Sequence, residues 1–211
     1  MSARLVVFAK APQAGLVKTR LIPALGAQGA ADLALRMLRH TLQQALAATQ
    51  SANVGPVELC MSPGPDDPAW AGVELPAAVL RTDQGEGDLG QRMARAVERV
   101  TATRGQSILL MGTDCPALSA ARIAEAAQAL AQHDAALVPV ADGGYVLVGL
   151  QAPCPAIFAD MAWSTPSVAA VTLQRLSALE QRVWVGPTLH DIDEPADLVH
   201  LPVHLHSGHG H

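Results

Sequence analysis

The sequence predicts an α/β fold built around a mainly parallel β-sheet. Short runs of apolar and β-branched residues alternate with longer segments of helical periodicity along the 211 residues. Strands and helices that alternate in this way form right-handed βαβ units, which place their strands parallel in one sheet. Half of the residues are hydrophobic and only 16% are charged, which is typical of a globular protein with its own core.

The apolar runs and the helical periodicities divide the chain into elements. We expect strands at residues 4–9, 57–62, 78–81, 107–112, 135–140, 145–150 and 182–186. We expect helices at residues 27–50, 88–103, 119–133 and 164–180, followed by a helical turn or two at 194–199. Ser119 is suited to cap the third helix, and Ser164 and Thr165 precede Pro166 as the cap and first turn of the fourth.

The domain organisation is simple. Neither a linker nor an internal repeat is visible, so we expect a single domain at residues 1–200. Residues 201–211 form a tail rich in histidine, which we expect to be mobile. The chain contains no apolar run of about 18 residues and no signal peptide, so we expect no membrane span.

Charge and cysteine content exclude several classes of function. The formal net charge is −5, which argues against a nucleic-acid surface, because such surfaces are strongly basic. The cations occur in small groups, a pattern that favours a compact anionic ligand. Cys60, Cys115 and Cys154 form no CxxC pair, which argues against a disulfide framework or structural zinc and favours a reducing cytoplasm.

Ligands of open α/β sheets bind outside the carboxyl ends of the strands, and the first strand is followed there by the loop AKAPQAGLVKTR. Gly15 allows a tight turn and a close approach to a ligand. Lys18 supplies a point charge, Arg20 a planar fork suited to phosphate oxygens, and Thr19 a hydroxyl. Val17 stands where a Walker loop needs glycine. We interpret the segment as an anion-binding loop; the alternative is a solvated loop with ordinary surface cations.

The glycine-rich loop after the third strand matches GxGxxG at Gly85, Gly87 and Gly90. A dinucleotide site is rejected, because the two acidic residues between these glycines would repel a pyrophosphate. The loop could instead wrap a nucleobase or ribose, with Gln84 bonding to the base edge. It could equally be a flexible loop whose Asp88 caps the next helix, and the two interpretations are compatible.

Two acidic segments follow strands and predict a cation site. Asp114 in GTDCP follows a buried strand, and Asp191 and Asp193 in HDIDEP lie on one side of an extended segment. Mg²⁺ and Mn²⁺ prefer hard oxygen ligands and bind through one or two carboxylates plus substrate phosphates. The alternatives are that Asp114 and Asp193 cap the helices that follow them. We expect Cys115 to be packed and not catalytic.

The turn ADGGY, between two predicted strands, gives candidate residues for an acceptor. Asp142 and Gly143 are a turn signal, so a plain hairpin is one interpretation. In the other, Gly144 allows the backbone to approach a ligand, and Asp142 orients an acceptor or acts as a base. Trp163 at the start of the fourth helix lines a pocket or packs in the core.

Taken together, these stretches resemble a known family. The motifs KAPQAGLVKTRL, QGEGDLGQRM, GTDCPAL, DGGYVLVGL, WSTP and DIDEPADL appear in this order in the DUF2064 proteins, and the resemblance covers residues 5–199. That family is often labelled as glycosyltransferases of arsenosugar-biosynthesis type, within the nucleotide-diphospho-sugar transferase superfamily. The resemblance implies a GT-A-like three-layer α/β/α sandwich, a nucleotide-sugar or nucleoside-triphosphate donor, a small-molecule acceptor, and Mg²⁺ or Mn²⁺.

The resemblance also implies roles for the candidate residues. Lys10 would join Lys18 and Arg20 on the donor phosphates, and Asp114 would be the metal-binding acid, with Asp193 or Asp191 completing the coordination. Gly112 stands where GT-A enzymes have the first acid of a DxD motif, and this departure is more similar to nucleotidylyltransferases. Glycosyl transfer, nucleotidylyl transfer and non-catalytic nucleotide binding therefore remain the three hypotheses.

Overall fold

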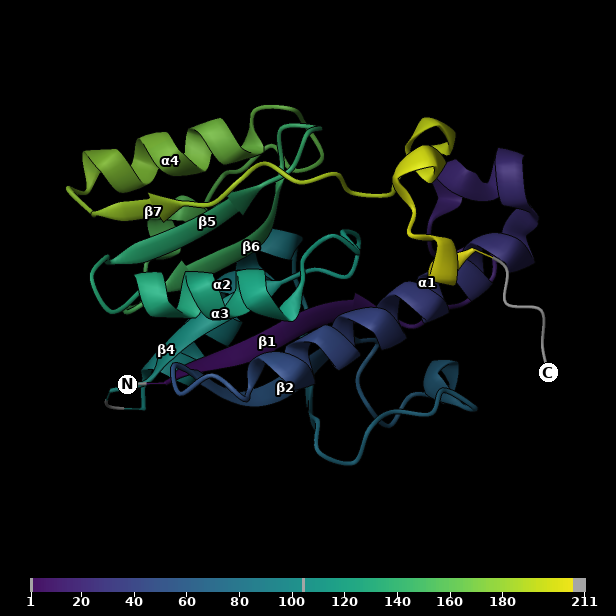
Figure 1. Ribbon diagram of the computed structural model, residues 1–211, viewed down its shortest axis with the longest axis horizontal. Coiled ribbons are helices and arrows are strands. Elements are labelled where there is room, and N and C mark those ends of the chain that lie inside the picture. The colour runs from purple at the N-terminus through teal and green to yellow at the C-terminus, as the bar shows by residue number, and fades with distance from the viewer. Residues whose placement is uncertain (1, 104, 207–211) are drawn as a thin grey trace.

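The computed structural model describes residues 2–103 and 105–206. Its centre is a seven-stranded sheet with the strand order β3-β2-β1-β4-β6-β5-β7 (Figure 1). The strands are β1 (Ala3–Lys10), β2 (Val54–Ser62), β3 (Leu80–Asp83), β4 (Ser107–Met111), β5 (Ala135–Pro139), β6 (Tyr145–Leu150) and β7 (Val183–Val185). Only β6 runs antiparallel to its neighbours β4 and β5 among the strands of the described chain. The predicted α/β class with a mainly parallel sheet is confirmed.

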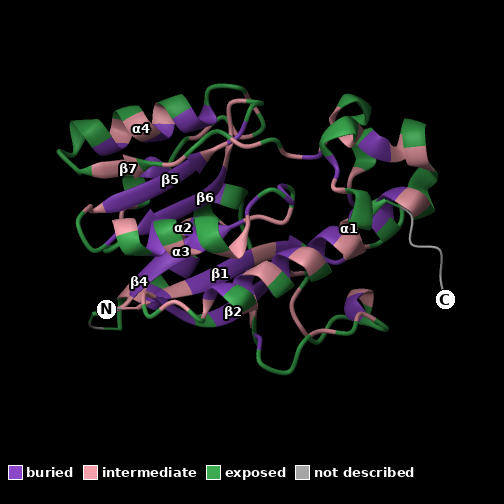
Figure 2. Cartoon of the chain, in the orientation of Figure 1, coloured by how far each residue is buried: buried purple, intermediate pink, exposed green. Residues whose placement is uncertain are grey.

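Helices cover both faces of this sheet. They are α1 (Ile22–Ala48), α2 (Leu89–Thr101), α3 (Ala120–Ala129) and α4 (Val168–Ala178). One core cluster joins the sheet to α1 and α3, and a second joins it to α2 and α4. The molecule is therefore the expected three-layer sandwich, and Figure 2 shows the strands buried between helices with exposed outer faces. None of the helices in residues 2–103 and 105–206 is long and apolar enough to cross a membrane.

The alternation of side chains along β1 explains why both faces need a helical layer. Leu5 and Val7 point into the cluster under α1 and α3, whereas Val6 and Phe8 pack toward α2 and α4. Successive residues of a strand point to opposite faces, so a continuous apolar run is stable only in a sheet covered on both sides.

The two helices that flank the predicted site begin differently from expectation. In α1, Pro23 occupies the first turn, where proline is tolerated, and the regular helix is interrupted at Gly26, which has a φ of 70°. The helix α4 begins at Val168 with Ser167 at its N-cap position, four residues later than predicted. Ser164 has a φ of 61°, a left-handed conformation that an α-helix cannot contain.

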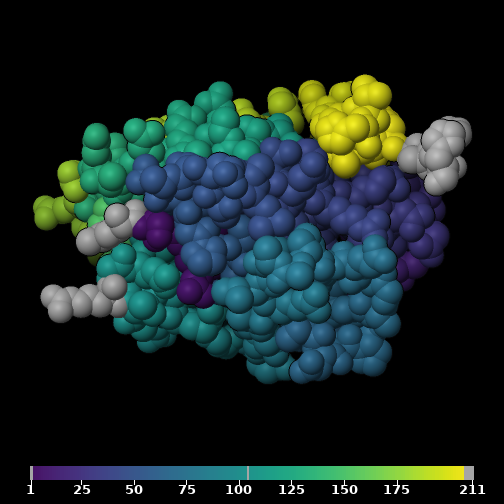
Figure 3. Space-filling model, turned by 60° about the horizontal axis from the view of Figure 1, so that its bottom comes forward, coloured from purple at the N-terminus to yellow at the C-terminus, as the bar shows by residue number. Residues whose placement is uncertain are grey.

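The last described residues pack against the start of α1. Two 3-10 segments, Pro195–His200 and Val203–Leu205, follow β7 and carry the chain back to that helix. Leu201 and Leu205 are buried there with Leu33 and Met37 of α1, and Figure 3 shows this C-terminal segment lying on the early part of the chain. Part of the segment expected as a mobile tail is thus packed, and residues 207–211 lie outside the described residues.

Candidate active site

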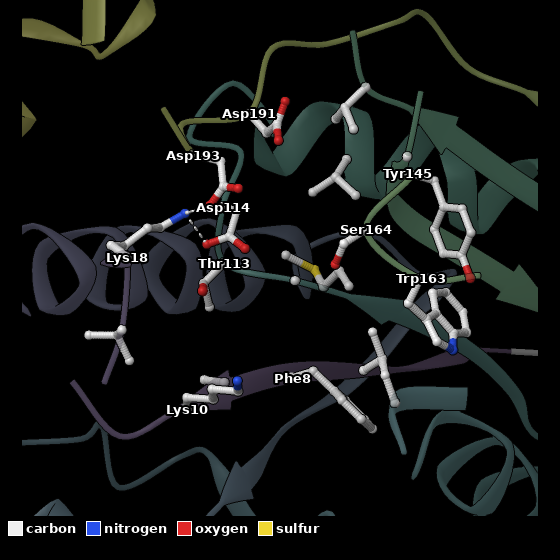
Figure 4. A pocket seen from close by; sticks show the side chains of 18 of the residues that line it. Phe8, Lys10, Lys18, Thr113, Asp114, Tyr145, Trp163, Ser164, Asp191 and Asp193 are labelled. Carbon is white, nitrogen blue, oxygen red and sulfur yellow. Dashed lines mark ion pairs between the residues drawn. The ribbon is translucent and has the colours of Figure 1, made fainter. Parts of the chain in front are cut away.

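A cavity of about 600 Å³ opens at the carboxyl ends of the central strands. Figure 4 shows how it collects side chains from segments that are far apart in the sequence. Of the predicted site residues, the cavity is lined by Lys10, Lys18, Thr19, Arg20, Gln84, Asp114, Asp142, Gly144, Trp163, Asp191 and Asp193. The remaining ones, which are Gly15, Gly85, Gly87, Asp88, Gly90 and Gly143, lie outside this lining.

The ammonium group of Lys18 lies at the centre of the acidic residues. Its Nζ donates to the carbonyl of Ile192 at 2.6 Å, and it lies 2.5 Å from Oδ1 of Asp114 and 3.7 Å from Oδ1 of Asp193 (Figure 4). The Lys18 side chain is only 6% exposed, and its backbone φ of 48° is left-handed. We call this arrangement the lysine cradle, defined by Lys18, Asp114, Ile192 and Asp193.

Arg20 extends the cradle toward solvent. Its guanidinium pairs with Asp193 at 2.8 Å and with Glu194 at 3.7 Å. The loop after β1 and the segment after β7 are therefore joined by three cation–carboxylate pairs to Asp193 and Glu194. This arrangement brings the two predicted motifs KTR and DIDEP into direct contact.

Neither acid of the cradle caps a helix, so the structural alternatives for these residues are wrong. Ser119 caps α3, as predicted, and accepts from the amide of Arg122. The segment after β7 begins with Glu194 as its N-cap, and the backbone amides of Asp193 and Glu194 donate to the carboxylate of Asp197 at 3.0 and 2.7 Å. The carboxylates of Asp114 and Asp193 are instead paired with the cations Lys18 and Arg20.

The donor set of the cradle fits a hard divalent cation. Two carboxylates and one carbonyl already hold a positive charge, which is the Lys18 ammonium. Mg²⁺ keeps water and phosphate ligands and needs only one or two carboxylates. Within the described residues, no group of three or more His, Cys, Asp or Glu side chains converges as a complete site. A cation at the cradle would therefore need ligands from a bound phosphate as well.

Asp191 and Asp142 line the same cavity. Burial, together with the carboxylate of Asp142, raises the pKa of Asp191. The Oδ1 atom of Asp142 accepts from the amide of Gly144 at 2.7 Å, which holds the turn between β5 and β6. The predicted hairpin is confirmed, because β5 and β6 pair antiparallel, and its Asp142 still lines the cavity.

The glycine-rich loop is organised mainly by its own contacts. The side-chain amide of Gln84 is buried and donates to the carbonyls of Ala9 and Cys60, tying the ends of β1 and β2 together. Asp88 forms a capping box with Gln91 at the start of α2. The predicted capping role of Asp88 is therefore confirmed, and the Gln84 amide already has backbone partners.

Cys115 behaves as the packed residue that the sequence predicts. It is 3% exposed and its Sγ donates to the carbonyl of His190 at 3.2 Å. Burial raises its pKa to about 11, so the thiol is protonated and unreactive at neutral pH.

Gly143 supports the site without lining it. It has a φ of +90°, and a Cβ atom placed on it would lie 2.0 Å from the carbonyl oxygen of Pro166. Its own carbonyl accepts from the amide of Ala169 at 2.9 Å. This hydrogen bond joins the turn to the start of α4, directly after the segment that contains Trp163.

Replacing Gly143 with Ala is expected to lower the free energy of unfolding by at least about 2 kcal/mol, because the added methyl group combines backbone strain with a steric clash. Gly72→Ala is the matched control: Gly72 has a φ of +77° but has open space around it, so it adds the strain alone. Urea denaturation measures both variants. Equal losses would show that the contact with Pro166 is unimportant.

Two aromatic residues of the cavity were missed at the level of sequence. Phe8 lies near the end of the apolar run of β1 and Tyr145 begins that of β6, so both resemble core residues. In the structure both pack on the second core cluster and also line the cavity. The scarcity of aromatics, at 3% of the sequence, together with a position at a strand end, is the signal that could have identified them.

Solved structures share this fold. A crystal structure from Desulfovibrio desulfuricans G20, described as a candidate nucleotide-diphospho-sugar transferase, is 28% identical with a TM-score of 0.82, over 94% of this chain and 85% of that one. A CMP-2-keto-3-deoxy-manno-octonic acid synthetase complexed with CTP is 12% identical, with a TM-score of 0.56, over 95% and 96%. The protein Rv0371c of Mycobacterium tuberculosis H37Rv in complex with manganese is 17% identical, with a TM-score of 0.53, over 95% and 98%.

These neighbours define the class: the chain has the fold of the nucleotide-diphospho-sugar transferases, and the likeness to the Desulfovibrio structure supports a transferase. No curated protein matches the sequence. The chain belongs to the family described as "Uncharacterized protein conserved in bacteria (DUF2064)", which matches residues 45–165. The family membership that the motifs predict is thereby confirmed, whereas the arsenosugar label stays a prediction.

Proposed function

We propose that this protein is a metal-dependent glycosyltransferase that uses a nucleotide-diphosphate sugar as donor. The observation that carries the proposal is the lysine cradle, in which Lys18 lies between Asp114 and Asp193 with Arg20 beside it. Cations and carboxylates alternate there at the carboxyl edge of the sheet, where open α/β folds bind their ligands. A diphosphate with a bound divalent ion has complementary charges: its oxygens match the cations of the protein, and its metal ion matches the carboxylates.

In this proposal each residue has a stated task. Lys10, Lys18 and Arg20 bind the donor phosphates and neutralise the charge that grows on the leaving diphosphate when the bond between sugar C1 and oxygen breaks. Asp114 and Asp193 hold Mg²⁺ or Mn²⁺, which supplies further positive charge to the same oxygens when bound. Asp142 accepts the proton from the attacking hydroxyl of the acceptor.

Nucleotidylyl transfer is the second candidate. It is favoured by Gly112, which replaces the first acid of a DxD pair and leaves Asp114 as the only acid of that strand end. In that reaction the acceptor attacks the α-phosphorus of a nucleoside triphosphate, and pyrophosphate leaves. The same three cations would then hold a triphosphate. A non-catalytic nucleotide-binding domain is the third possibility.

One assay set separates the three functions. The protein is incubated with Mn²⁺, a panel of nucleoside triphosphates and of UDP- and GDP-sugars, and a cell extract as the source of acceptor. Release of nucleoside diphosphate is the expected result. Release of pyrophosphate would replace the proposal with nucleotidylyl transfer, and tight nucleotide binding without any product would leave a binding domain.

Replacing Lys18 with Ala is expected to weaken donor binding about 10- to 100-fold, because a hydrogen bond to a charged group contributes about 1.5–3 kcal/mol. The same variant is expected to bind Mn²⁺ more tightly without nucleotide, because the ammonium no longer competes for Asp114 and Asp193. Calorimetry measures both affinities. Arg122→Ala is the control, since Arg122 pairs on the surface of α3 with Glu125. An unchanged donor affinity would contradict the role of the loop.

A further inference from the structure

The cavity has two chemically different ends. The cations in its lining are Lys10, Lys18 and Arg20, and all three come from β1 and the loop after it. On the side of β6 the lining includes residues from the start of that strand and from the segment before α4, none of them charged: Tyr145, Val146, Trp163, Ser164, Thr165 and Val168. Figure 4 shows Lys18 with its acids on one side and Tyr145 with Trp163 on the other.

Aromatic side chains are concentrated in this cavity. The chain has two Phe, one Tyr and three Trp residues, and Phe8, Tyr145 and Trp163 all line this one cavity. These three side chains are partly buried against the core cluster of α2 and α4. One side of each ring is therefore held by packing, and the rest of its surface faces the cavity. We call Tyr145 and Trp163 the aromatic end; Phe8 belongs to β1, the strand that leads to the cations.

The aromatic end carries no charge at neutral pH. Burial raises the pKa of Tyr145 well above its ordinary value, so its phenol stays protonated. The nearest basic residue of α4, Arg175, donates to the carbonyls of Ala156, Ala159 and Asp160 and lies outside the lining. On the β6 side of β4 the charged residues of the lining are Asp142, Asp191 and Asp193, and their carboxylates repel anions.

The sheet order separates Tyr145 and Trp163 from the donor half. The phosphate-binding loop follows β1, and the loop with Gln84 follows β3, both on one side of β4. Tyr145 begins β6, and Trp163 lies between β6 and α4, on the other side of β4. A donor that lies along the first half therefore leaves the aromatic end for the second substrate.

From this arrangement we infer that the acceptor is an uncharged hydroxyl compound with a ring or apolar body, and not a phosphorylated or carboxylated sugar. The inference rests on the proposed function, because it assigns the acceptor of the same site. A ring stacks on Trp163 and Tyr145, and its hydroxyl lies toward Asp142. An anionic acceptor would meet carboxylates and aromatic faces with no cation to pair with, which costs the desolvation of its charge.

The test uses two probes that differ in one charge: phenyl β-D-glucoside and 4-carboxyphenyl β-D-glucoside. Their binding is measured by saturation-transfer NMR with magnesium pyrophosphate present to fill the cationic end. The protein is expected to bind the neutral probe at least tenfold more tightly. Equal or tighter binding of the carboxylated probe would overturn the inference.

Two variants locate the preference. Trp163→Ala is expected to lower the affinity for the neutral probe at least tenfold and to leave the affinity for nucleotide unchanged. Ser164→Lys, which places a cation on an exposed residue of the lining, is expected to raise affinity for the carboxylated probe at least tenfold. Ser177→Lys, on the exposed surface at the end of α4, adds the same charge outside the cavity and is expected to change neither affinity.

The outcomes for acceptor and donor are separable. If Trp163→Ala lowered the affinity for nucleotide as much as the affinity for the neutral probe, the aromatic end would be a nucleobase site and the inference would be wrong. If Ser177→Lys raised the affinity for the carboxylated probe as much as Ser164→Lys does, the cause would be the net charge of the protein, and the inference would also fail. If no nucleotide bound while the charge preference and both variant effects persisted, the proposed transferase would be wrong and the neutral-ligand site would stand.

Discussion

Replacing Asp114 with Asn is expected to lower turnover about a thousandfold, because a divalent ion contributes several kcal/mol of charge stabilisation and about 4 kcal/mol corresponds to a factor of a thousand. The substitution keeps the shape of the side chain and removes only its charge. Initial rates with the donor found by the product assay, at saturating Mn²⁺, measure the effect. Mn²⁺ affinity in the presence of nucleotide is expected to fall with it.

This expectation needs a variant that folds normally. The Asp114 side chain is 55% exposed, and Lys18 keeps the carbonyl of Ile192 and the carboxylate of Asp193 as partners, so the thermal midpoint should change little. Asp32→Asn is the matched control, because Asp32 is exposed on α1 and accepts from Gln28 four residues earlier. Full activity of the Asp114 variant would show that this residue holds no catalytic ion.

Replacing Glu58 with Gln is expected to lower the free energy of unfolding by about 3 kcal/mol at pH 7, because breaking a buried ion pair leaves its partners uncompensated. Glu58 is fully buried in β2. Its carboxylate accepts from Thr82 at 2.7 Å, from Arg4 at 3.3 Å and from both terminal nitrogens of Arg99. These partners come from β1, β3 and α2, so Glu58 joins three elements at the amino half of the sheet.

The free energy of unfolding lost in Glu58→Gln should be larger at neutral pH than in acid. Burial alone would raise the pKa of Glu58, but hydrogen bonds from Arg99, Thr82 and Arg4 outweigh it and lower the pKa below the ordinary value of 4.5. A lowered pKa means that the ionised form stabilises the fold above pH 4.5, and that this contribution is lost as the pH falls through the lowered value. The difference in the free energy of unfolding between wild type and Glu58→Gln is therefore expected to become smaller as the pH falls below 4.5.

Urea denaturation across this pH range measures the effect. Glu98→Gln is the control, since Glu98 is exposed on α2 and its replacement should change the free energy of unfolding by less than about 0.5 kcal/mol. A loss for Glu58→Gln that is the same at pH 7 and below pH 4 would show that lost packing, and not lost charge, causes it.

The order and kind of the elements could be predicted because local patterns are strong in this chain. The run RLVVFA is buried on both faces as part of β1, which is what a continuous apolar run in a parallel sheet requires. Element ends were less predictable. The start of α4 was placed four residues too early, because the left-handed conformation of Ser164 depends on contacts beyond its neighbours in sequence.

Candidate residues at strand ends could also be predicted, because parallel strands bring their carboxyl ends to one edge of the sheet. Asp114, Asp193 and Lys18 were identified in this way, and all of them line the cavity. Their mutual arrangement could not be predicted. That Lys18 lies 2.5 Å from Asp114 depends on a contact between residues 96 positions apart in the chain, for which neither local sequence carries a signal.

The sequence by itself therefore determined the fold class, the element order, the family and the strand ends that carry chemistry, because periodicity, turns and caps are local properties. Only the tertiary structure decided that a lysine holds the two acids together, that Gly143 fastens the hairpin to α4, and that Phe8, Tyr145 and Trp163 face one cavity. The physical reason is that these contacts join side chains from different strands, and their geometry exists only once the sheet and its covering helices have packed.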